Sequence, residues 1–220
     1  MFSHLSKYTR PEPLSSALIT IDLQNDFVRP GAPAESAGAA DAAVKTGELV
    51  QFYRELQLPI IHVIRIYSPE DNAKNVDVCR REAIENGLQL VVSGTEGMQP
   101  VSEIVPEGFR ANGELLRKGG IQTVSEQEFM IYKPRWGCFY QTPLQQLLND
   151  LKISTVAIAG TWFSNCVRTT IYEATARDYR AVALSDAIAG IYEQGEIELA
   201  NIQCGVCSCN DWSQFVRNAG

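Results

Sequence analysis

The chain has 220 residues, 45% of them hydrophobic and 20% charged, which suits one globular domain with a sizeable core. Its formal net charge of −7 disfavours a nucleic-acid-binding or anionic-membrane surface. No apolar stretch approaches the roughly 18 residues that span a bilayer, and the first residues lack the apolar core of a signal peptide. We therefore expect one cytoplasmic domain over residues 1–220, with a loose N-terminal segment at 1–14 and no membrane or nucleic-acid partner.

Apolar runs alternate with helical patterns along the chain. Strands are expected at residues 17–21, 59–66, 129–132, 154–159, 180–184 and 204–207, and helices at 39–56, 80–86, 142–151, 166–176 and 193–202. Strands separated by helices indicate βαβ units, so the predicted fold class is a parallel, Rossmann-like, three-layer α/β sandwich. Residues 68–124 have a mixed pattern, which is where an insertion that shapes the substrate pocket would lie.

The numbers of cysteines and histidines limit which disulfide, metal and catalytic sites the chain can form. Six cysteines in a chain of this length do not make a disulfide scaffold. The two histidines are His4 and His62, so a histidine-rich metal site is excluded, and we expect no metal and no cofactor. A Ser–His or Cys–His enzyme would have to use His62, which lies inside an apolar run and is better interpreted as a core histidine.

Three reactive residues follow predicted strands. Asp22 follows 17–21, Lys133 follows 129–132, and Cys166 comes one turn after 156–160. Ligand crevices of open α/β sheets lie beyond the carboxyl ends of the strands, so an acid, an amine and a thiol are expected to meet there. With Ser164 as helix N-cap, Cys166 would fall in the first helical turn, where the helix dipole and a nearby cation favour a thiolate.

Each of these residues also has an ordinary structural interpretation. Cys166 could be a small buried hydrophobe, Asp22 a residue that caps a turn, and Lys133 a solvated residue at a strand end. A second group of thiols near the C-terminus could form a redox pair or half of a zinc site, but we favour core or surface roles for its members, Cys204, Cys207 and Cys209.

Several motifs resemble those of the isochorismatase-like cysteine hydrolases. They are ITIDLQNDF at 19–27, GTEG at 94–97, FMIYKPRWGCFY at 129–140, GTWFSNCVR at 160–168 and SDA at 185–187. The resemblance extends from about residue 17 to residue 197. It implies a six-stranded, mostly parallel sheet flanked by helices, and a homodimer or homotetramer.

The resemblance also implies roles for individual residues. Cys166 would be the nucleophile, Asp22 the general base and Lys133 the positively charged partner. A cis peptide bond is implied between Thr161 and Trp162, which would aim the Trp162 amide, together with the Cys166 amide, at an oxyanion. Six residues are expected to bind the substrate: Phe27, Arg65, Trp136, Phe139, Trp162 and Arg168.

Two departures from the family pattern narrow the expected activity. Nicotinamidases of the family build a metal site with histidines after the second strand, whereas residues 65–71 contain no histidine. Trp162 stands where relatives often have a small residue, so the pocket should be reshaped or narrowed.

The resulting prediction is a cysteine-dependent hydrolase that cleaves a C–N bond of a small carboxamide or ureido substrate through a thioester. Ether-cleaving members lack the cysteine, so Cys166 favours amide cleavage. The alternatives are an ether hydrolase, a non-catalytic binding protein of the same family, or a thiol redox or metal-binding protein.

Overall fold

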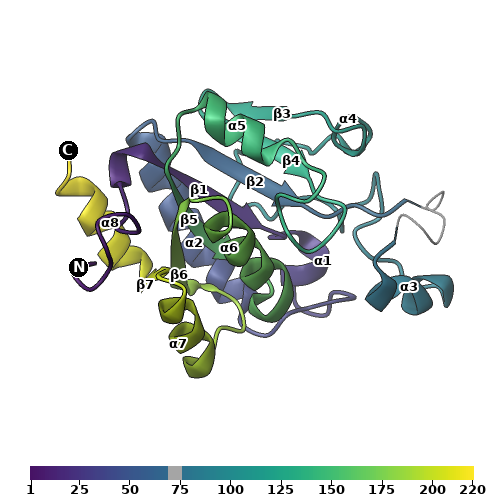
Figure 1. The fold of residues 1–220 in the computed structure, drawn as a ribbon. Helices are drawn as coiled ribbons and strands as arrows, with labels where there is room; N and C mark the ends of the chain where they lie inside the picture. Colours follow the sequence, from purple (N-terminus) through teal and green to yellow (C-terminus); the bar gives the residue numbers. More distant parts are fainter. Residues whose placement is uncertain (69–75) are drawn as a thin grey trace.

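The computed structural model describes residues 1–68 and 76–220 and is built around a central sheet (Figure 1). The sheet has seven strands in the order β3-β4-β2-β1-β5-β6-β7. Their bounds are β1 Ser16–Ile21, β2 Ile60–Ile64, β3 Gln122–Ser125, β4 Glu128–Tyr132, β5 Thr155–Gly160, β6 Arg180–Ile188 and β7 Gly205–Cys207. All neighbouring strands pair in parallel except β3 and β4, which are antiparallel. The predicted three-layer α/β fold with a mostly parallel sheet is thus confirmed.

The expected count of six strands is too low by one. The additional strand is β3, whose sequence is QTVS and whose residues are all partly or fully exposed. It is a short edge strand that pairs only with β4. Because such a strand buries neither face, it has no apolar run by which the sequence pattern could reveal it.

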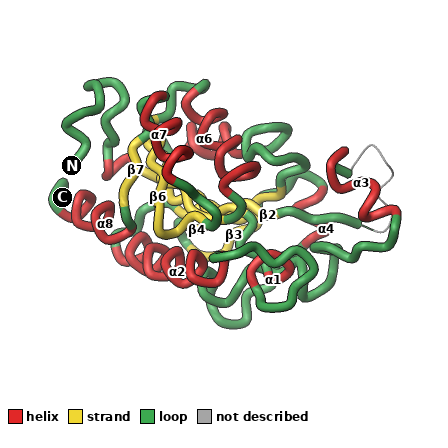
Figure 2. The backbone as a smooth tube through the Cα atoms, turned by 90° about the horizontal axis from the view of Figure 1, so that it is seen from below, coloured by secondary structure: helices red, strands yellow, loops and turns green. Residues whose placement is uncertain are grey.

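Helices cover both faces of the sheet, as Figure 2 shows. The face covered by α2 and α8 forms one hydrophobic core, and the face covered by α5, α6 and α7 forms the other. The helices are α1 Asn25–Val28, α2 Ala39–Glu55, α3 Val78–Glu85, α4 Gly113–Arg117, α5 Leu144–Asp150, α6 Arg168–Thr175, α7 Glu193–Asn201 and α8 Cys209–Arg217. In the described part of the chain, none combines the length and apolarity that a membrane crossing requires.

The central strands supply both cores. In β1, Leu18 belongs to the core beneath α2, whereas Ile19 and Ile21 belong to the core beneath α6. Successive side chains of a strand point to opposite faces, so a strand buried on both sides needs an unbroken apolar run. This requirement explains why the central strands were predictable from sequence.

Two apolar residues of the N-terminal segment, which was expected to be loose over 1–14, pack against the rest of the chain. Phe2 and Leu5 are buried, with 2% and 3% of their surfaces exposed. The Phe2 ring lies edge-on to Trp212 and Phe215 of α8, with centroid distances of 6.3 and 5.2 Å. The sequence did not suggest this packing of Phe2 and Leu5, because α8, which forms the partner surface, was itself not predicted.

Candidate active site

The predicted reactive residues meet at the carboxyl edge of the sheet. Asp22 follows β1, Arg65 follows β2, Lys133 follows β4, and Cys166 lies in the turn beyond β5. These strands are neighbours in the order β4-β2-β1-β5. From β1 the chain continues to β2 on one side of the sheet, and from β5 it continues to β6 on the other side. The strand order therefore reverses between β1 and β5, and α/β proteins form ligand crevices at such a topological switch point.

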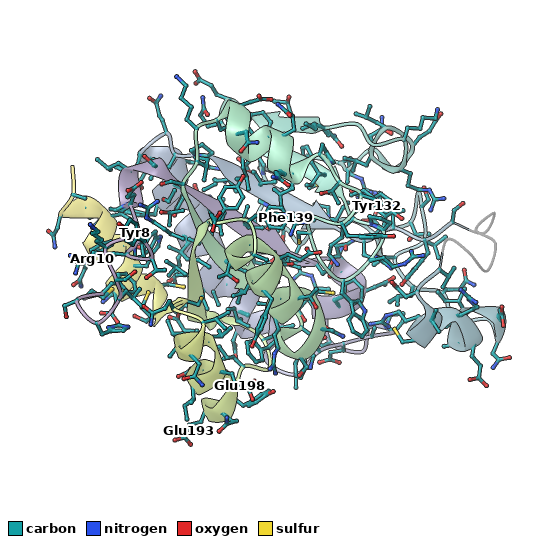
Figure 3. All side chains as sticks on the ribbon, viewed as in Figure 1. Tyr8, Arg10, Tyr132, Phe139, Glu193 and Glu198 are labelled. Atoms are coloured by element: carbon teal, nitrogen blue, oxygen red, sulfur yellow. The ribbon has the colours of Figure 1, made fainter. Side chains whose placement is uncertain are left out.

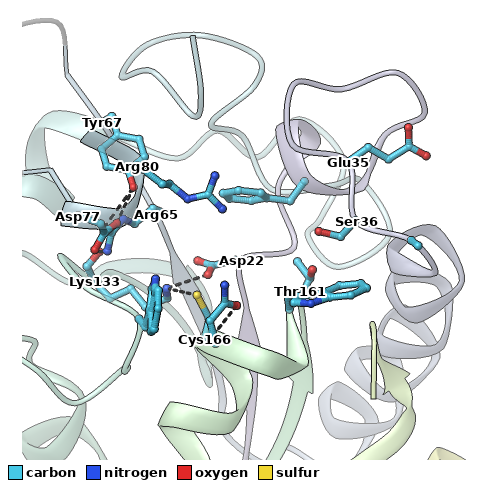
Figure 4. A pocket seen from close by; sticks show the side chains of 15 residues that line it. Asp22, Glu35, Ser36, Arg65, Tyr67, Asp77, Arg80, Lys133, Thr161 and Cys166 are labelled. Carbon is cyan, nitrogen blue, oxygen red and sulfur yellow. Dashed lines mark hydrogen bonds and ion pairs between the residues drawn. The ribbon is translucent and has the colours of Figure 1, made fainter. Parts of the chain in front are cut away.

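A cavity of about 340 Å³ opens at this edge (Figure 4), within the size range of small-molecule sites. It is lined by charged, polar and aromatic side chains, namely Asp22, Phe27, Glu35, Ser36, Ala37, Arg65, Tyr67, Asp77, Arg80, Lys133, Trp136, Thr161, Trp162, Asn165 and Cys166. The lining includes the predicted reactive trio and four of the six predicted substrate-binding residues.

The backbone conformation of Asp22 is fixed at the end of β1. Its φ of 52° is in the left-handed region, which aspartate tolerates better than most residues, and its N–H donates to Val63 O at 2.9 Å. The carboxylate is buried, and its Oδ2 lies 2.7 Å from Lys133 Nζ. Among the described residues, Oδ1 has no hydrogen-bond partner, so this atom is available to accept a proton.

Lys133 carries its charge inside the protein. The residue is fully buried, and its Nζ donates to Cys166 Sγ at 3.2 Å and to Arg135 O at 3.3 Å. Burial by itself lowers the pKa of Lys133, but the negative charge of Asp22 outweighs it and raises the pKa above its ordinary value. Lys133 is therefore an ammonium that bridges the carboxylate and the thiol.

Cys166 differs from the prediction in two respects. It lies in a π-helical turn, Phe163–Val167, that precedes α6, and Ser164 is inside this turn rather than at its N-cap. Burial, and then the charge of Asp22, raise the pKa of Cys166 to about 12 against the opposing effect of Lys133. The resting group is a neutral thiol rather than the expected thiolate, because desolvation outweighs the nearby cation.

The turn before Cys166 passes close to the end of β1. Gly160 has a φ of 131°, and a Cβ at this position would collide with Ile21 O. The peptide bond that follows Thr161, to Trp162, is cis. The Cys166 N–H donates to the side-chain Oδ1 of Asn165 at 2.8 Å.

Arg65 reaches the pocket wall but is already paired. Its guanidinium forms an ion pair with Asp77, lies 3.3 Å from Tyr67 Oη, and donates to Lys133 O at 3.1 Å. Tyr67 Oη in turn donates to Asp77 Oδ2 at 2.6 Å. Arg65 therefore holds α3 against the end of β2, a role that the sequence did not reveal because its partner Asp77 lies in the mixed stretch 68–124, where no such contact was expected.

Two predicted substrate-binding residues are not in the pocket lining. Phe139 is buried in the core on the α6 side, with its ring 5.8 Å from that of Tyr179 and the Arg177 guanidinium 4.9 Å away. Arg168 forms an ion pair with Glu198 and a 3.2 Å hydrogen bond to Tyr192 Oη. The pocket lining thus does not include these two residues, and their roles in substrate binding stay predictions.

The family model of the Isochorismatase domain matches residues 16–207. The chain belongs to the isochorismatase family. It is 26% identical to a probable inactive nicotinamidase of Arabidopsis thaliana over 91% of this chain and 95% of the relative. It is 24% identical to a ureidoacrylate amidohydrolase of Methylobacterium radiotolerans over 88% and 77%, respectively.

Solved structures share the isochorismatase fold with this chain. An isochorismatase family protein from Desulfovibrio vulgaris superimposes with a TM-score of 0.77 at 26% identity, covering 92% of this chain and 98% of that one. An N-carbamoylsarcosine amidase from Thermoplasma acidophilum superimposes with a TM-score of 0.68 at 22% identity, covering 89% and 96%. The relatives of this isochorismatase family member thus include hydrolases of small amides.

The histidine residues of this isochorismatase family member are not arranged for metal binding. His62 is buried, with Nδ1 2.8 Å from Thr20 Oγ1 and Nε2 2.7 Å from Glu128 Oε1, so both ring nitrogens are occupied. Within residues 1–68 and 76–220, no three His, Cys, Asp or Glu side chains are grouped in a way that could hold a metal ion. Of the stretch 65–71, residues 69–71 lie outside the described part.

The three cysteines near the C-terminus are buried or half-buried in the protein. Cys204 and Cys209 are buried, Cys207 is half-buried, and all are free thiols. Burial raises the pKa of Cys204 and of Cys207 to about 12 and raises that of Cys209 as well. Cys204 and Cys209 belong to the two hydrophobic cores and Cys207 packs against one of them, which supports the core interpretation of this group.

Proposed function

We propose that this protein is a cysteine amidohydrolase that cleaves the C–N bond of a small carboxamide or ureido compound. One observation supports the proposal most: Lys133 Nζ lies 2.7 Å from Asp22 Oδ2 and 3.2 Å from Cys166 Sγ, at a cavity of small-molecule size. A base, a cation and a thiol in mutual contact are what nucleophilic catalysis by cysteine requires.

The first half-reaction begins from the neutral thiol. As the Cys166 Sγ attacks the carbonyl carbon, its proton passes to the unoccupied Oδ1 of Asp22. Lys133 stabilises the sulfur while it becomes negative. The proton on Asp22 then moves to the leaving nitrogen, the C–N bond breaks, and ammonia or a small amine departs from a thioester.

The second half-reaction restores the enzyme. Asp22 removes a proton from a water molecule, which attacks the thioester carbonyl. The C–S bond breaks, the acid product leaves, and the proton returns to the Cys166 sulfur. Together the two halves consume one amide and one water and release one acid and one amine.

The tetrahedral intermediates need hydrogen-bond donors for their oxyanion. We assign this role to the backbone amides of Trp162 and Cys166. The Cys166 amide donates to Asn165 Oδ1, so the oxyanion would take over a hydrogen bond that the Asn165 side chain accepts when no substrate is bound. Trp162 also lines the cavity.

Replacement of the thiol tests the proposal. Ammonia release from a panel of small amides and ureido compounds should fall by about 10³-fold or more in Cys166→Ala and in Cys166→Ser. Cys79→Ala is the matched control, because Cys79 is an exposed free thiol outside the pocket. Full activity of Cys166→Ala would contradict the nucleophile assignment. Binding of amides without turnover by the wild type would favour the non-catalytic alternative.

A further inference from the structure

The charged residues that line the pocket are mostly paired with one another. Asp22 pairs with Lys133, and Arg65 pairs with Asp77. Glu35 is exposed at the rim, where its Oε2 accepts a hydrogen bond from Gly31 N at 2.8 Å. Each of these groups therefore has a partner that partly or fully satisfies its charge.

Arg80 is different. Its guanidinium lies over the Phe27 ring, 5.8 Å from the centroid, and no carboxylate among the described residues forms an ion pair with it. Figure 4 shows its side chain extending into the pocket above Asp22 and Cys166. A half-buried cation in this position gives the pocket a positive charge that no carboxylate within residues 1–68 and 76–220 pairs with.

The location of Arg80 is fixed by the beginning of α3. Asp77 is the N-cap residue of this helix, and its carbonyl accepts the Arg80 N–H at 3.0 Å. The Asp77 carboxylate is bound by Arg65 and by Tyr67 Oη, both of which come from the chain after β2. The first turn of α3, and with it Arg80, is thereby anchored to the edge of the sheet that carries the nucleophile.

We propose that Arg80 binds a carboxylate group of the substrate while Cys166 attacks the amide or ureido carbonyl of the same molecule. A guanidinium can hold a carboxylate through two parallel hydrogen bonds, and the Phe27 ring, 5.8 Å from Arg80 Cζ, forms one side of its surroundings. One guanidinium that has no ion-pair partner among the described residues suits a monoanion better than a phosphate. The inference rests on the proposed function and names the substrate class as small ω-carbamoyl or ureido acids.

Matched substrates test this assignment. The rate constant kcat/KM is measured for malonamate, succinamate and glutaramate, and for neutral amides in which an isopropyl group replaces the carboxylate, such as 4-methylpentanamide for succinamate. In Arg80→Met, the ratio of kcat/KM for the acid to that for its neutral counterpart should fall by about 10- to 100-fold, as expected for loss of a charge-assisted pair. Arg80→Lys should retain part of the ratio.

Arg81→Met is the matched control. It removes the same charge from the next position of α3, and Arg81 is not among the residues that line the pocket. Its ratio should remain that of the wild type. An equal ratio in the wild type and in Arg80→Met, or a wild type that prefers the neutral amides, would overturn the assignment while leaving the amidase proposal intact.

A binding measurement tests carboxylate binding by Arg80 without requiring turnover. Calorimetric titration of Cys166→Ala with the same acids should give binding that weakens by about 10-fold or more when Arg80→Met is added. If the wild type hydrolyses no amide but this binding persists, the amidase proposal fails and the carboxylate site stands. If none of the acids binds, or if they bind equally with and without Arg80, the assignment is overturned.

Discussion

At the scale of single residues, the resting active site carries its negative charge on Asp22 and not on the nucleophile Cys166. Asp22 and Lys133 form a buried ion pair, whereas Cys166, in contact with both, keeps its proton. A thiolate next to an ionised carboxylate in a desolvated pocket would be costly. Proton transfer from Cys166 to Asp22 moves the negative charge without creating a second one, so the nucleophile can form when the substrate is in place.

Asp22→Asn separates the two effects of the carboxylate. Because burial and then the charge of Asp22 raise the thiol pKa to about 12, removal of that charge should lower it and leave Lys133 to favour the thiolate. Alkylation of Cys166 by iodoacetamide should therefore extend to lower pH than in the wild type. Turnover should nevertheless fall by about 10²–10⁴-fold, because the general base is gone.

Asp22→Asn can also disprove the electrostatic coupling between Asp22 and the Cys166 thiol. Asparagine has nearly the shape of aspartate, so the comparison with the wild type leaves packing almost unchanged. Cys79→Ala in both backgrounds removes the exposed thiol that would otherwise react. An unchanged pH profile of Cys166 alkylation, together with normal turnover, would mean that Asp22 is neither the base nor an electrostatic neighbour of the thiol.

The sequence was informative where a reactive residue directly follows a buried strand. Asp22 and Lys133 stand one residue beyond β1 and β4, so the strand pattern alone placed them at one edge of the sheet. Arg80 gave no such signal, because it lies on a short, mostly polar helix whose position depends on the long-range Arg65–Asp77 ion pair. Contacts between distant segments do not appear in local periodicity.

At the scale of elements, a buried polar cluster joins β2, β4 and α2. Glu128 of β4 accepts hydrogen bonds from Arg54 of α2 at 2.7 and 2.9 Å, and its Oε1 lies 2.7 Å from His62 Nε2 of β2. Burial raises the pKa of Glu128, but the hydrogen bonds and charges of His62 and Arg54 outweigh it and lower the pKa to about 2. The cluster satisfies polar groups that would otherwise be buried without partners.

This lowered pKa gives a stability prediction with a definite sign. A carboxylate whose folded pKa of about 2 is below its ordinary value of 4.5 stabilises the folded state above pH 4.5, and the contribution is lost as the pH falls toward 2. Glu128→Gln should therefore lower the free energy of unfolding at pH 7 by about 1–3 kcal/mol. Urea denaturation at several pH values should show the difference from the wild type shrinking toward pH 3.

Glu126→Gln is the control for this series. Glu126 is exposed and lies two residues before Glu128, so its replacement should change the free energy of unfolding by no more than about 0.5 kcal/mol at any pH. A difference between Glu128→Gln and the wild type that stays constant from pH 7 to pH 3 would show that the effect arises from packing and not from the charge.

Among the elements, apolar content decided which ones could be predicted. The strands β1, β2, β4, β5 and β6 are buried and were expected near their observed positions. The polar edge strand β3 was missed, and so was α8, whose apolar residues Trp212 and Val216 are separated by polar ones. In α8 the apolar spacing is helical, but polar residues fill most of its nine positions, so no continuous apolar pattern marks the helix.

At the scale of the whole molecule, the two ends of the chain pack together. Phe2 packs against both Trp212 and Phe215 of α8 and contacts β7, where a Cβ on Gly205 would be 2.7 Å from Phe2 Cε1. Trp212 in turn donates from Nε1 to Tyr53 Oη of α2 at 2.9 Å. The N-terminal segment thus continues a packed layer that runs from α2 through α8.

Replacing Phe2 by alanine measures how much its packing contributes to the free energy of unfolding. Phe2→Ala should lower the free energy of unfolding by about 3 kcal/mol, at the low end for a buried phenylalanine because a terminal segment can detach and relax. Tyr8→Ala is the control, since Tyr8 is 73% exposed and its loss should cost no more than about 0.5 kcal/mol. Urea denaturation gives both values, and hydrogen exchange of the α8 amides should be faster in Phe2→Ala. If Phe2→Ala unfolds like the wild type and the α8 amides stay protected, the segment is loose in solution, as the sequence suggested, and α8 is held by α2 alone.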